Sequence, residues 1–291
     1  MQRRAKFIVG GVAVLAILAL GRYGMIDTQR SSAAVDSTAA EALSGNSAVL
    51  LAASGDTDAL AVRDWLRAQV SGQTVFLPSA GVGLLADLGE DPRDQSRVRL
   101  IPTGRSVSKA AAGETGGWDA DRIWPVARGL ADQRSAAYLD LHNIRAAEPD
   151  LDQRRGGRGY SEGSEARTLE PADSVKGDMA RVLFYMSLRY DGHDGGASLR
   201  LVVRPAEPGE AAMGGLCTLL DWNDRDPVDS GEARRNDRVE RYQNNRNPFV
   251  DRPEFARVLW GGPARADRPA ARPGPAAASR RTAPARPPAR R

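Results

Sequence analysis

The segment WDADRIWPVARGL at residues 118–130 places an acidic and a basic side chain next to each other between two tryptophans. Adjacent Asp121 and Arg122 have two interpretations. As a solvent-exposed ion pair they would contribute little to stability. Alternatively, they lie where a hydrolytic enzyme keeps its working groups. The rest of the chain has to decide between a surface pair and a reactive site.

Three further stretches combine many polar residues with apolar anchors. They are YLDLHNIRAAEPDLDQRRGGRGY (138–160), EPADSVKGDMARVLFYM (170–186) and DWNDRDPVDSGEARRN (221–236), which is followed by NNRNPFVDRPEFA (244–256). Taken one at a time, each has a simple structural interpretation. His142 would be a structural histidine whose ring nitrogens are satisfied by the backbone, and His193 would be a loop residue.

Together and in this order, the four stretches resemble the endonuclease I family of secreted or periplasmic nucleases, over roughly residues 97–260. The family reads approximately WNREHVWPxSRG at the first stretch, DLHNLRPADGxVNxxRGN at the second, VKGDVARxxFYM at the third, and DPVxxxExxRN…QxNRNPFxDHPE at the fourth. The segments VKGDMARVLFYM, DPVDSGEARRN and NNRNPFVDRPE match almost letter for letter. The resemblance implies an α+β fold in which a ββα-metal (His-Me) finger is embedded in a mainly helical single domain.

The chemistry that the resemblance implies is metal-dependent hydrolysis of phosphodiesters. One divalent ion, typically Mg²⁺, is held by a carboxylate and an asparagine of the finger and offsets charge that develops on the phosphate. A histidine next to the carboxylate takes a proton from the attacking water, and arginines contact the phosphate. The family acts on DNA, RNA or both with little sequence preference, as expected for contacts made mainly to the backbone.

Several positions depart from the family pattern, and all of them carry polar or charged residues in the family. Asp121 and Arg122 stand in place of Glu-His, Asp152 and Gly157 in place of two asparagines, Asn223 in place of the histidine after tryptophan, and Arg252 in place of the histidine of DHPE.

The resemblance assigns roles to seven residues of this chain. Asp121 and Asp152 are the expected metal ligands, because both keep a carboxylate oxygen that a hard cation can use. Arg122 occupies the general-base position, and Arg155 matches the arginine of RGN and is expected to act at the phosphate. The expected nucleic-acid contacts are Arg155, Arg158, Arg234 and Arg235.

Arg122 is the substitution with the largest consequence. A guanidinium stays protonated at physiological pH and cannot accept a proton, so it cannot be the general base. General-base catalysis typically contributes about 10²–10⁴-fold to a rate. Either His142 approaches the site, or water is activated without a separate base, or the chain is a catalytically silent nucleic-acid-binding or structural module on the same fold. The leading hypothesis is an exported endonuclease, with the silent module as the alternative.

The elements that must position these residues are partly visible in the sequence. Helical spacing predicts a helix from Thr57 with Ala61, Val62, Trp65 and Ala68 on one face, and a second helix within residues 171–190 capped by Asp173 or Ser174. A third helix is expected to begin at Asp229, where DSGE forms a capping box. Residues 97–102 and 199–204 alternate like strands with one buried face.

Charge and composition divide the chain of 291 residues into four parts. Residues 1–22 combine basic residues with an apolar run and predict a signal peptide, with an uncleaved membrane anchor as the alternative. Residues 23–47 read as a flexible linker, 48–260 as the endonuclease I-like domain, and 261–291 as a disordered tail rich in Arg, Pro and Ala. The tail carries a formal charge of +7 and residues 1–22 carry +4, which leaves 23–260 with −7.

Composition also limits the partners. A single cysteine excludes an intrachain disulfide. A monomer that is secreted or periplasmic and binds nucleic acid is expected, with one divalent metal ion and no dinucleotide cofactor. Membrane contact is expected only if the N-terminal segment is retained, with the domain then outside the cytoplasm.

Overall fold

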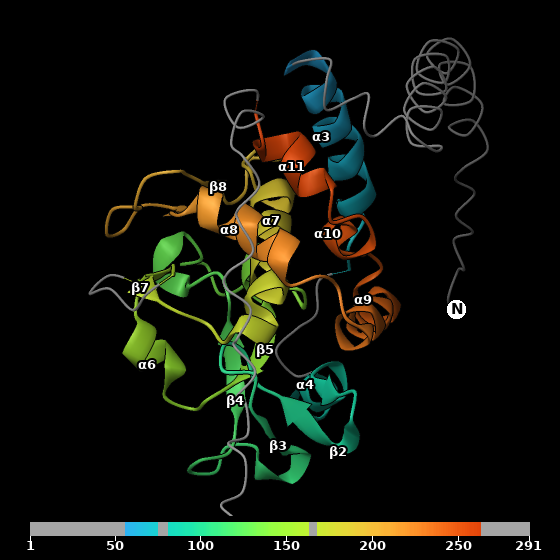
Figure 1. Ribbon diagram of the computed structural model, residues 1–291, viewed down its shortest axis with the longest axis vertical. Helices are drawn as coiled ribbons and strands as arrows, with labels where there is room; N and C mark the ends of the chain where they lie inside the picture. Colours follow the sequence, from blue (N-terminus) through green and yellow to red (C-terminus); the bar gives the residue numbers. More distant parts are fainter. Residues whose placement is uncertain (1–55, 75–80, 163–167, 263–291) are drawn as a thin grey trace, which may run out of the picture.

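The computed structural model describes residues 56–74, 81–162 and 168–262 (Figure 1). The predicted signal segment and linker, and the predicted tail from residue 263 onward, lie outside the described residues. Within them, helices and short strands alternate, which confirms the predicted α+β class. No helix of the described ranges is long and apolar enough to cross a membrane.

The helices differ widely in length, whereas all the strands are short. The helices are α3 (Asp56–Val70), α4 (Gly81–Leu88), α5 (Ala136–Leu139), α6 (Leu151–Arg155), α7 (Lys176–Arg189), α8 (Leu216–Arg225), α9 (Ser230–Gln243), α10 (Pro248–Asp251) and α11 (Phe255–Trp260). The strands are β1 (Glu90–Asp91), β2 (Asp94–Arg99), β3 (Ser106–Ser108), β4 (Asp119–Arg122), β5 (Ile144–Ala147), β6 (Gly159–Tyr160), β7 (Thr168–Leu169), β8 (Arg200–Leu201) and β9 (Ala212–Met213). β1, β2 and β3 form one antiparallel sheet, β4 pairs with β5 in antiparallel fashion, and β6–β7 and β8–β9 are parallel pairs.

Helix α7 runs through the centre of the molecule (Figure 1). Every residue of α7 is buried, including its charged ones. It packs against α8, α3 and α10, and the main hydrophobic cluster forms around it. The apolar stripe predicted this helix correctly, but the structure buries its polar side as well. The expected cap is absent, since neither Asp173 nor Ser174 caps α7, and Asp173 instead forms an ion pair with Lys176 at 2.8 Å.

Helix α9 begins as predicted. The Asp229 side chain accepts hydrogen bonds from the backbone N–H groups of Gly231 and Glu232, both at 2.8 Å. Glu232 does not complete the capping box, because its carboxylate is turned toward Arg181 of α7. Asp229 therefore caps the start of α9 alone, and Glu232 forms an ion pair in the core instead.

Two other predictions were only partly correct. The buried face of α3 consists of Val62, Leu66 and Val70, while Ala61 and Ala68 of the predicted face are exposed. The strand predicted at 97–102 ends at residue 99, and the one predicted at 199–204 shrinks to β8 at 200–201. After β2 the chain turns back into β3, with which it pairs, and β8 is followed by its partner β9.

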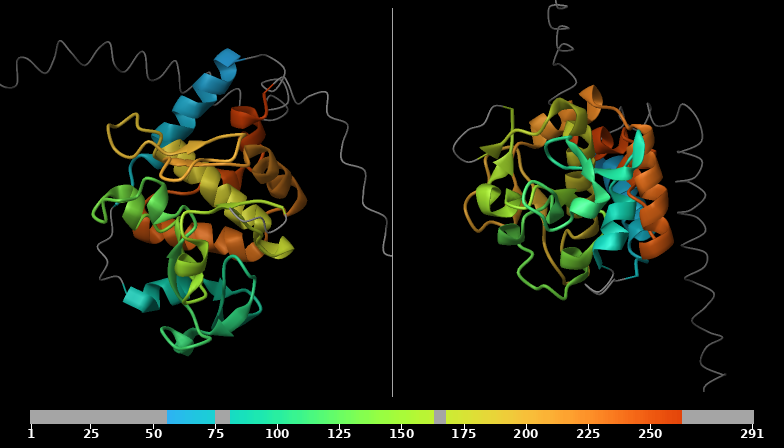
Figure 2. Two further views of the ribbon diagram at one scale, coloured as in Figure 1. Left: turned by 90° about the vertical axis from the view of Figure 1, so that its left-hand side faces the viewer. Right: turned by 90° about the horizontal axis from the view of Figure 1, so that it is seen from below.

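The two ends of the described chain lie side by side. Helix α11 packs against α3, with the rings of Trp65 and Phe255 in an edge contact at 6.1 Å and the Arg63 guanidinium over the Trp260 ring at 5.4 Å. Figures 1 and 2 place this pair of helices at one end of the molecule and the β1–β3 sheet with α4 at the other.

Strands β4 and β5 and helix α6 follow one another along the chain and are here called the ββα unit. In the antiparallel register Asp121 faces Arg145 and Arg122 faces Ile144. The connection between the strands contains a 3₁₀ turn (Val126–Arg128) and α5. The unit brings together β4 and α6, the two segments that carry the expected catalytic and metal-binding residues.

Candidate functional site

Asp121 and Arg122 are the last two residues of β4. Adjacent residues of a strand point to opposite faces, so the two side chains have different surroundings. Asp121 is buried with 8% of its surface exposed, whereas Arg122 is half-buried. The simple surface ion pair between the two neighbours is therefore not what this structure contains.

The Asp121 carboxylate is held by Arg155 of α6. Nη1 of Arg155 donates to Oδ2 at 2.7 Å and Nη2 donates to Oδ1 at 3.1 Å, a two-pronged contact. Nη1 also donates to the Tyr160 hydroxyl at 2.8 Å, and Arg155 is 1% exposed. Burial lowers the pKa of the guanidinium, but Tyr160 and Asp121 more than offset this and hold it above its ordinary value. One expected metal ligand and the expected phosphate contact are thus paired with each other.

Arg122 is oriented by Tyr138 of α5. Its Nε donates to the Tyr138 carbonyl oxygen at 2.8 Å, and its guanidinium carbon lies 3.5 Å from the centre of the Tyr138 ring. Such stacking fixes the plane of a guanidinium and leaves its charge in place. The general-base position therefore carries a held, permanently charged group.

Helix α6 places the remaining residues of the second motif. Asp152 lies three positions before Arg155, and nothing is described of the Asp152 side chain. Arg158 is half-buried, and its Nε donates to the Arg155 carbonyl oxygen at 3.1 Å. The turn after α6 uses Gly156 at a positive φ of 53°, a conformation that favours glycine.

The two arginines of the fourth motif have opposite environments. Arg234 is exposed on α9. Arg235 is buried, and its Nη2 donates to the carbonyl oxygens of Leu141 and Ile144, both at 2.7 Å. Because Ile144 is the first residue of β5, Arg235 braces the ββα unit from within. Of the expected nucleic-acid contacts, Arg158 and Arg234 reach the surface, whereas Arg155 and Arg235 lie in the interior.

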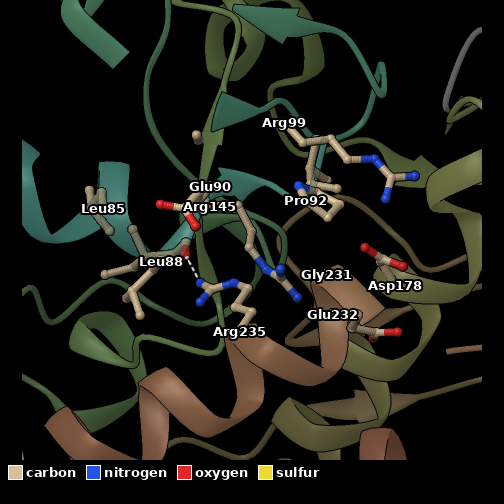
Figure 3. Close-up of a pocket in the computed structure, with 14 residues that line it drawn as sticks. Leu85, Leu88, Glu90, Pro92, Arg99, Arg145, Asp178, Gly231, Glu232 and Arg235 are labelled. Atoms are coloured by element: carbon tan, nitrogen blue, oxygen red, sulfur yellow. Dashed lines mark hydrogen bonds between the residues drawn. The ribbon is translucent and has the colours of Figure 1, made fainter. Parts of the chain in front are cut away.

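A charged cavity behind β5 was not predicted from the sequence. Arg145, Arg235, Asp178 and Glu232 line it together with Leu85 and Leu88 of α4 (Figure 3). Within the described part of the chain, Nε of Arg145 and Nε and Nη1 of Arg235 are buried without a hydrogen-bond partner. Burial, followed by the negative charge of Glu232, raises the pKa of Asp178 to about 7.

An ion pair next to this cavity joins α7 to α9. Arg181 Nε donates to both oxygens of Glu232 at 2.8 and 2.9 Å, and Nη2 donates to Oε2 at 2.6 Å. Both side chains are almost completely buried, at 0% and 1% exposure. Glu232 and Arg181 belong to the matched motifs, yet their spacing of 51 residues gave no sign that they pair.

His142 lies in the core, away from any role as a base at Asp121. Its Nε2 is 3.3 Å from the Asn245 carbonyl oxygen, and its ring packs against Tyr185 with centroids 4.4 Å apart. Burial lowers its pKa to about 4, although the nearby Asp140 works in the opposite direction. The structural interpretation of His142 fits this environment, in which the ring stays neutral at physiological pH.

The neutral state of His142 makes acid stability testable. The folded pKa of about 4 lies below the ordinary value of 6.5, so only the unfolded chain takes up this proton between them. The free energy of unfolding should therefore fall by about 3 kcal/mol as pH drops from 6.5 toward 4. Urea unfolding of wild type and of His142→Gln between pH 4 and 6.5 measures how much of the pH dependence comes from His142. His193→Gln, which replaces an exposed loop histidine, is the control and should show the same pH dependence as wild type. Equal pH dependence in wild type and His142→Gln would contradict the assignment.

The residues around Asp121 do not fit a divalent metal ion. Both carboxylate oxygens already accept hydrogen bonds from Arg155, and Arg122 offers no acceptor atom. A hard cation needs several oxygen ligands. Among the described residues, no group of three or more His, Cys, Asp or Glu side chains is arranged to hold a metal ion.

Comparisons with known proteins are consistent with the motif pattern. A sequence profile described as Endonuclease I matches residues 86–254. An extracellular ribonuclease of Bacillus amyloliquefaciens is 36% identical over 213 residues, which cover 69% of this chain and 74% of that protein. An extracellular ribonuclease of Bacillus subtilis (strain 168) is 35% identical over 204 residues, 66% of this chain and 71% of that protein.

Proposed function

Because this chain belongs to the endonuclease I family of nucleases, we propose that it is an exported monomer that binds the phosphodiester backbone of RNA or DNA. We further propose that the protein hydrolyses this backbone far more slowly than a family member that carries the Glu-His pair. The observation that carries it is the guanidinium of Arg122, held by Tyr138 beside Asp121 at the end of β4.

Export is supported by the pattern of residues 1–22 and by the relatives, both of which are named extracellular ribonucleases. The same names favour RNA as the first substrate to test, while the family as a whole also acts on DNA. The alternative of a retained N-terminal anchor leaves the domain on the same side of the membrane.

Backbone binding needs cations at the surface. Arg158 next to the ββα unit and Arg234 on α9 have exposed surface and are the proposed phosphate contacts. Contacts to phosphate oxygens carry no direct sequence information, which agrees with little sequence preference. Arg155 and Arg235 act indirectly in this proposal, since they hold Asp121 and the start of β5 in place.

Hydrolysis requires a group that takes a proton from the attacking water. Arg122 cannot do so, and the loss of a general base typically costs about 10²–10⁴-fold in rate. A fixed guanidinium can still stabilise negative charge that develops on phosphate oxygens. A divalent ion at Asp121 and Asp152, as the family resemblance implies, would neutralise charge on the phosphate; the pairing of Asp121 with Arg155 speaks against it in this chain.

A second candidate function is a nucleic-acid-binding module without catalysis. The Asp121–Arg155 ion pair favours it, because that contact removes the carboxylate as an acceptor for a metal ion or a proton. The two candidates share the fold and the polymer they bind, and they differ only in whether any cleavage remains.

One experiment tests the proposal and separates the candidates. The protein is incubated with plasmid DNA and with RNA in Mg²⁺, Mn²⁺ or EDTA, beside Arg122→His and Asp121→Ala, and binding is measured by gel shift. We expect wild type to bind, with cleavage at least about 100-fold slower than that of a family member with the Glu-His pair. Cleavage equal to the protein-free control supports the binding module.

Two outcomes would contradict the proposal. Rapid metal-dependent cleavage by wild type that disappears in Asp121→Ala would show a working metal site and sink both candidates. Absence of binding to either polymer at low ionic strength would remove nucleic acid as the partner.

A further inference from the structure

We propose that the Arg155 guanidinium takes the place of a divalent cation in the ββα unit: it is the permanent counter-ion of Asp121, and the chain engages nucleic acid with no metal ion at this position. The nucleic-acid part rests on the proposed function above. The metal part stands on the geometry of the described residues and is tested separately.

The first argument is the geometry of the contact. Both Asp121 oxygens accept from separate nitrogens of Arg155, at 2.7 and 3.1 Å, so the guanidinium covers the edge of the carboxylate. The Arg155 side chain is 0% exposed and that of Asp121 is 10% exposed. A charged hydrogen bond shielded from water is stronger than one at the surface, and an incoming cation would have to displace it.

The second argument is that the guanidinium is anchored from several sides. Its Nη1 also donates to Tyr160 Oη at 2.8 Å, and that hydroxyl donates to the Ile123 carbonyl oxygen at 3.1 Å. The Arg155 carbonyl accepts from the Arg158 backbone N–H at 3.1 Å. These contacts tie α6 and β6 to the residue that follows β4. Arg155 thereby joins the strand to the helix through side-chain contacts alone.

The third argument is charge. Asp121 and Asp152 carry two negative charges, and Arg122 and Arg155 carry two positive ones, so their formal sum is zero before any ion arrives. A site for a divalent cation needs an excess of negative or neutral oxygen ligands. Around Asp121, the guanidinium groups of Arg122 and Arg155 stand where such oxygen ligands would be needed.

The test measures metal binding directly on the full chain, without reference to activity. Mn²⁺ is titrated at low ionic strength and followed by electron paramagnetic resonance, and thermal unfolding is recorded in Mg²⁺, Mn²⁺ and EDTA. The variants are Arg155→Met and Asp121→Asn. The matched control is Arg154→Met, which removes the neighbouring arginine of α6, an exposed residue paired with Asp150 at 2.9 Å.

We expect wild type and Arg154→Met to bind no Mn²⁺ and to unfold at the same temperature with or without divalent ions. Arg155→Met should unfold at a lower temperature in EDTA and recover part of the loss in millimolar Mn²⁺, because the ion then neutralises Asp121. Saturable Mn²⁺ binding by wild type that Asp121→Asn abolishes would overturn the proposal. So would a folded Arg155→Met that takes up no Mn²⁺.

The same samples keep the two proposals apart. RNA gel shifts in Mg²⁺ and in EDTA should be identical for wild type. Loss of RNA binding in both conditions would contradict the proposed function and leave the metal result unaffected, whereas binding that requires Mg²⁺ and disappears in Asp121→Asn would overturn the role of Arg155.

Discussion

The combined variant Asp121→Glu, Arg122→His and Asp152→Asn should cleave RNA in Mg²⁺ about 10²–10⁴-fold faster than wild type. The histidine supplies a base whose pKa lies near neutrality. The longer carboxylate moves its oxygens one methylene beyond the position in which Arg155 holds both of them. The asparagine keeps an oxygen ligand at position 152, where the family resemblance implies a metal ligand. Initial rates on RNA and plasmid in Mg²⁺ and EDTA measure the gain.

The single variant Arg122→His is the matched control for this result. It supplies the base but leaves Asp121 bound to Arg155, so its gain should be smaller than that of the combined variant. An equally large gain would show that the base alone was missing and that Arg155 does not block the carboxylate. A combined variant that folds like wild type, yet gains nothing in Mg²⁺, would show that the ββα unit lacks more than these three residues.

Arg181→Met should lower the free energy of unfolding by about 3–5 kcal/mol, because it leaves the Glu232 carboxylate buried without its counter-ion. Glu232 is 1% exposed and receives three hydrogen bonds from Arg181. Urea or thermal unfolding at neutral pH measures the effect.

Two further variants control this measurement. Arg225→Met removes an arginine of α8 whose partner Glu162 is exposed, so it should cost only about 0–1 kcal/mol. The double variant Arg181→Met with Glu232→Met should recover much of the loss, since it leaves no unpaired buried charge. If Arg181→Met and Arg225→Met lowered the free energy of unfolding by amounts within about 1 kcal/mol of each other, the importance of the Arg181–Glu232 pair would be contradicted.

The sequence correctly predicted the helices that depend on residues close together in the chain. Apolar residues from Val175 to Met186 recur at helical spacing, and α7 forms over Lys176–Arg189. The Asp229 cap depends on backbone groups two and three residues away, and it was found. The buried face of α3 was misplaced, because spacing alone does not tell which of two adjacent apolar faces meets α7 and α11.

The candidate site could be located from the sequence, whereas its internal pairing could not. The tryptophans at 118 and 124 mark the strand that carries Asp121 and Arg122, and the structure places both at the end of β4. Which cation meets Asp121 depends on how α6 docks against β4, and Arg155 lies 34 positions away. Arg145 and Arg235 meet at one cavity for the same reason. Such long-range contacts follow from tertiary packing, which residue types and local spacing do not encode.

The packing of α11 on α3 also bears on how the protein can be immobilised. The described chain begins at residue 56 and ends at residue 262, and both points lie at the end of the molecule formed by these two helices (Figure 1). The ββα unit lies toward the opposite end. An attachment made at residue 56 or at residue 262 would therefore hold the molecule by one pole and turn the ββα unit outward. Proteins coupled to a sensor surface at residue 56 and at residue 262 should accordingly present the same face to RNA in solution.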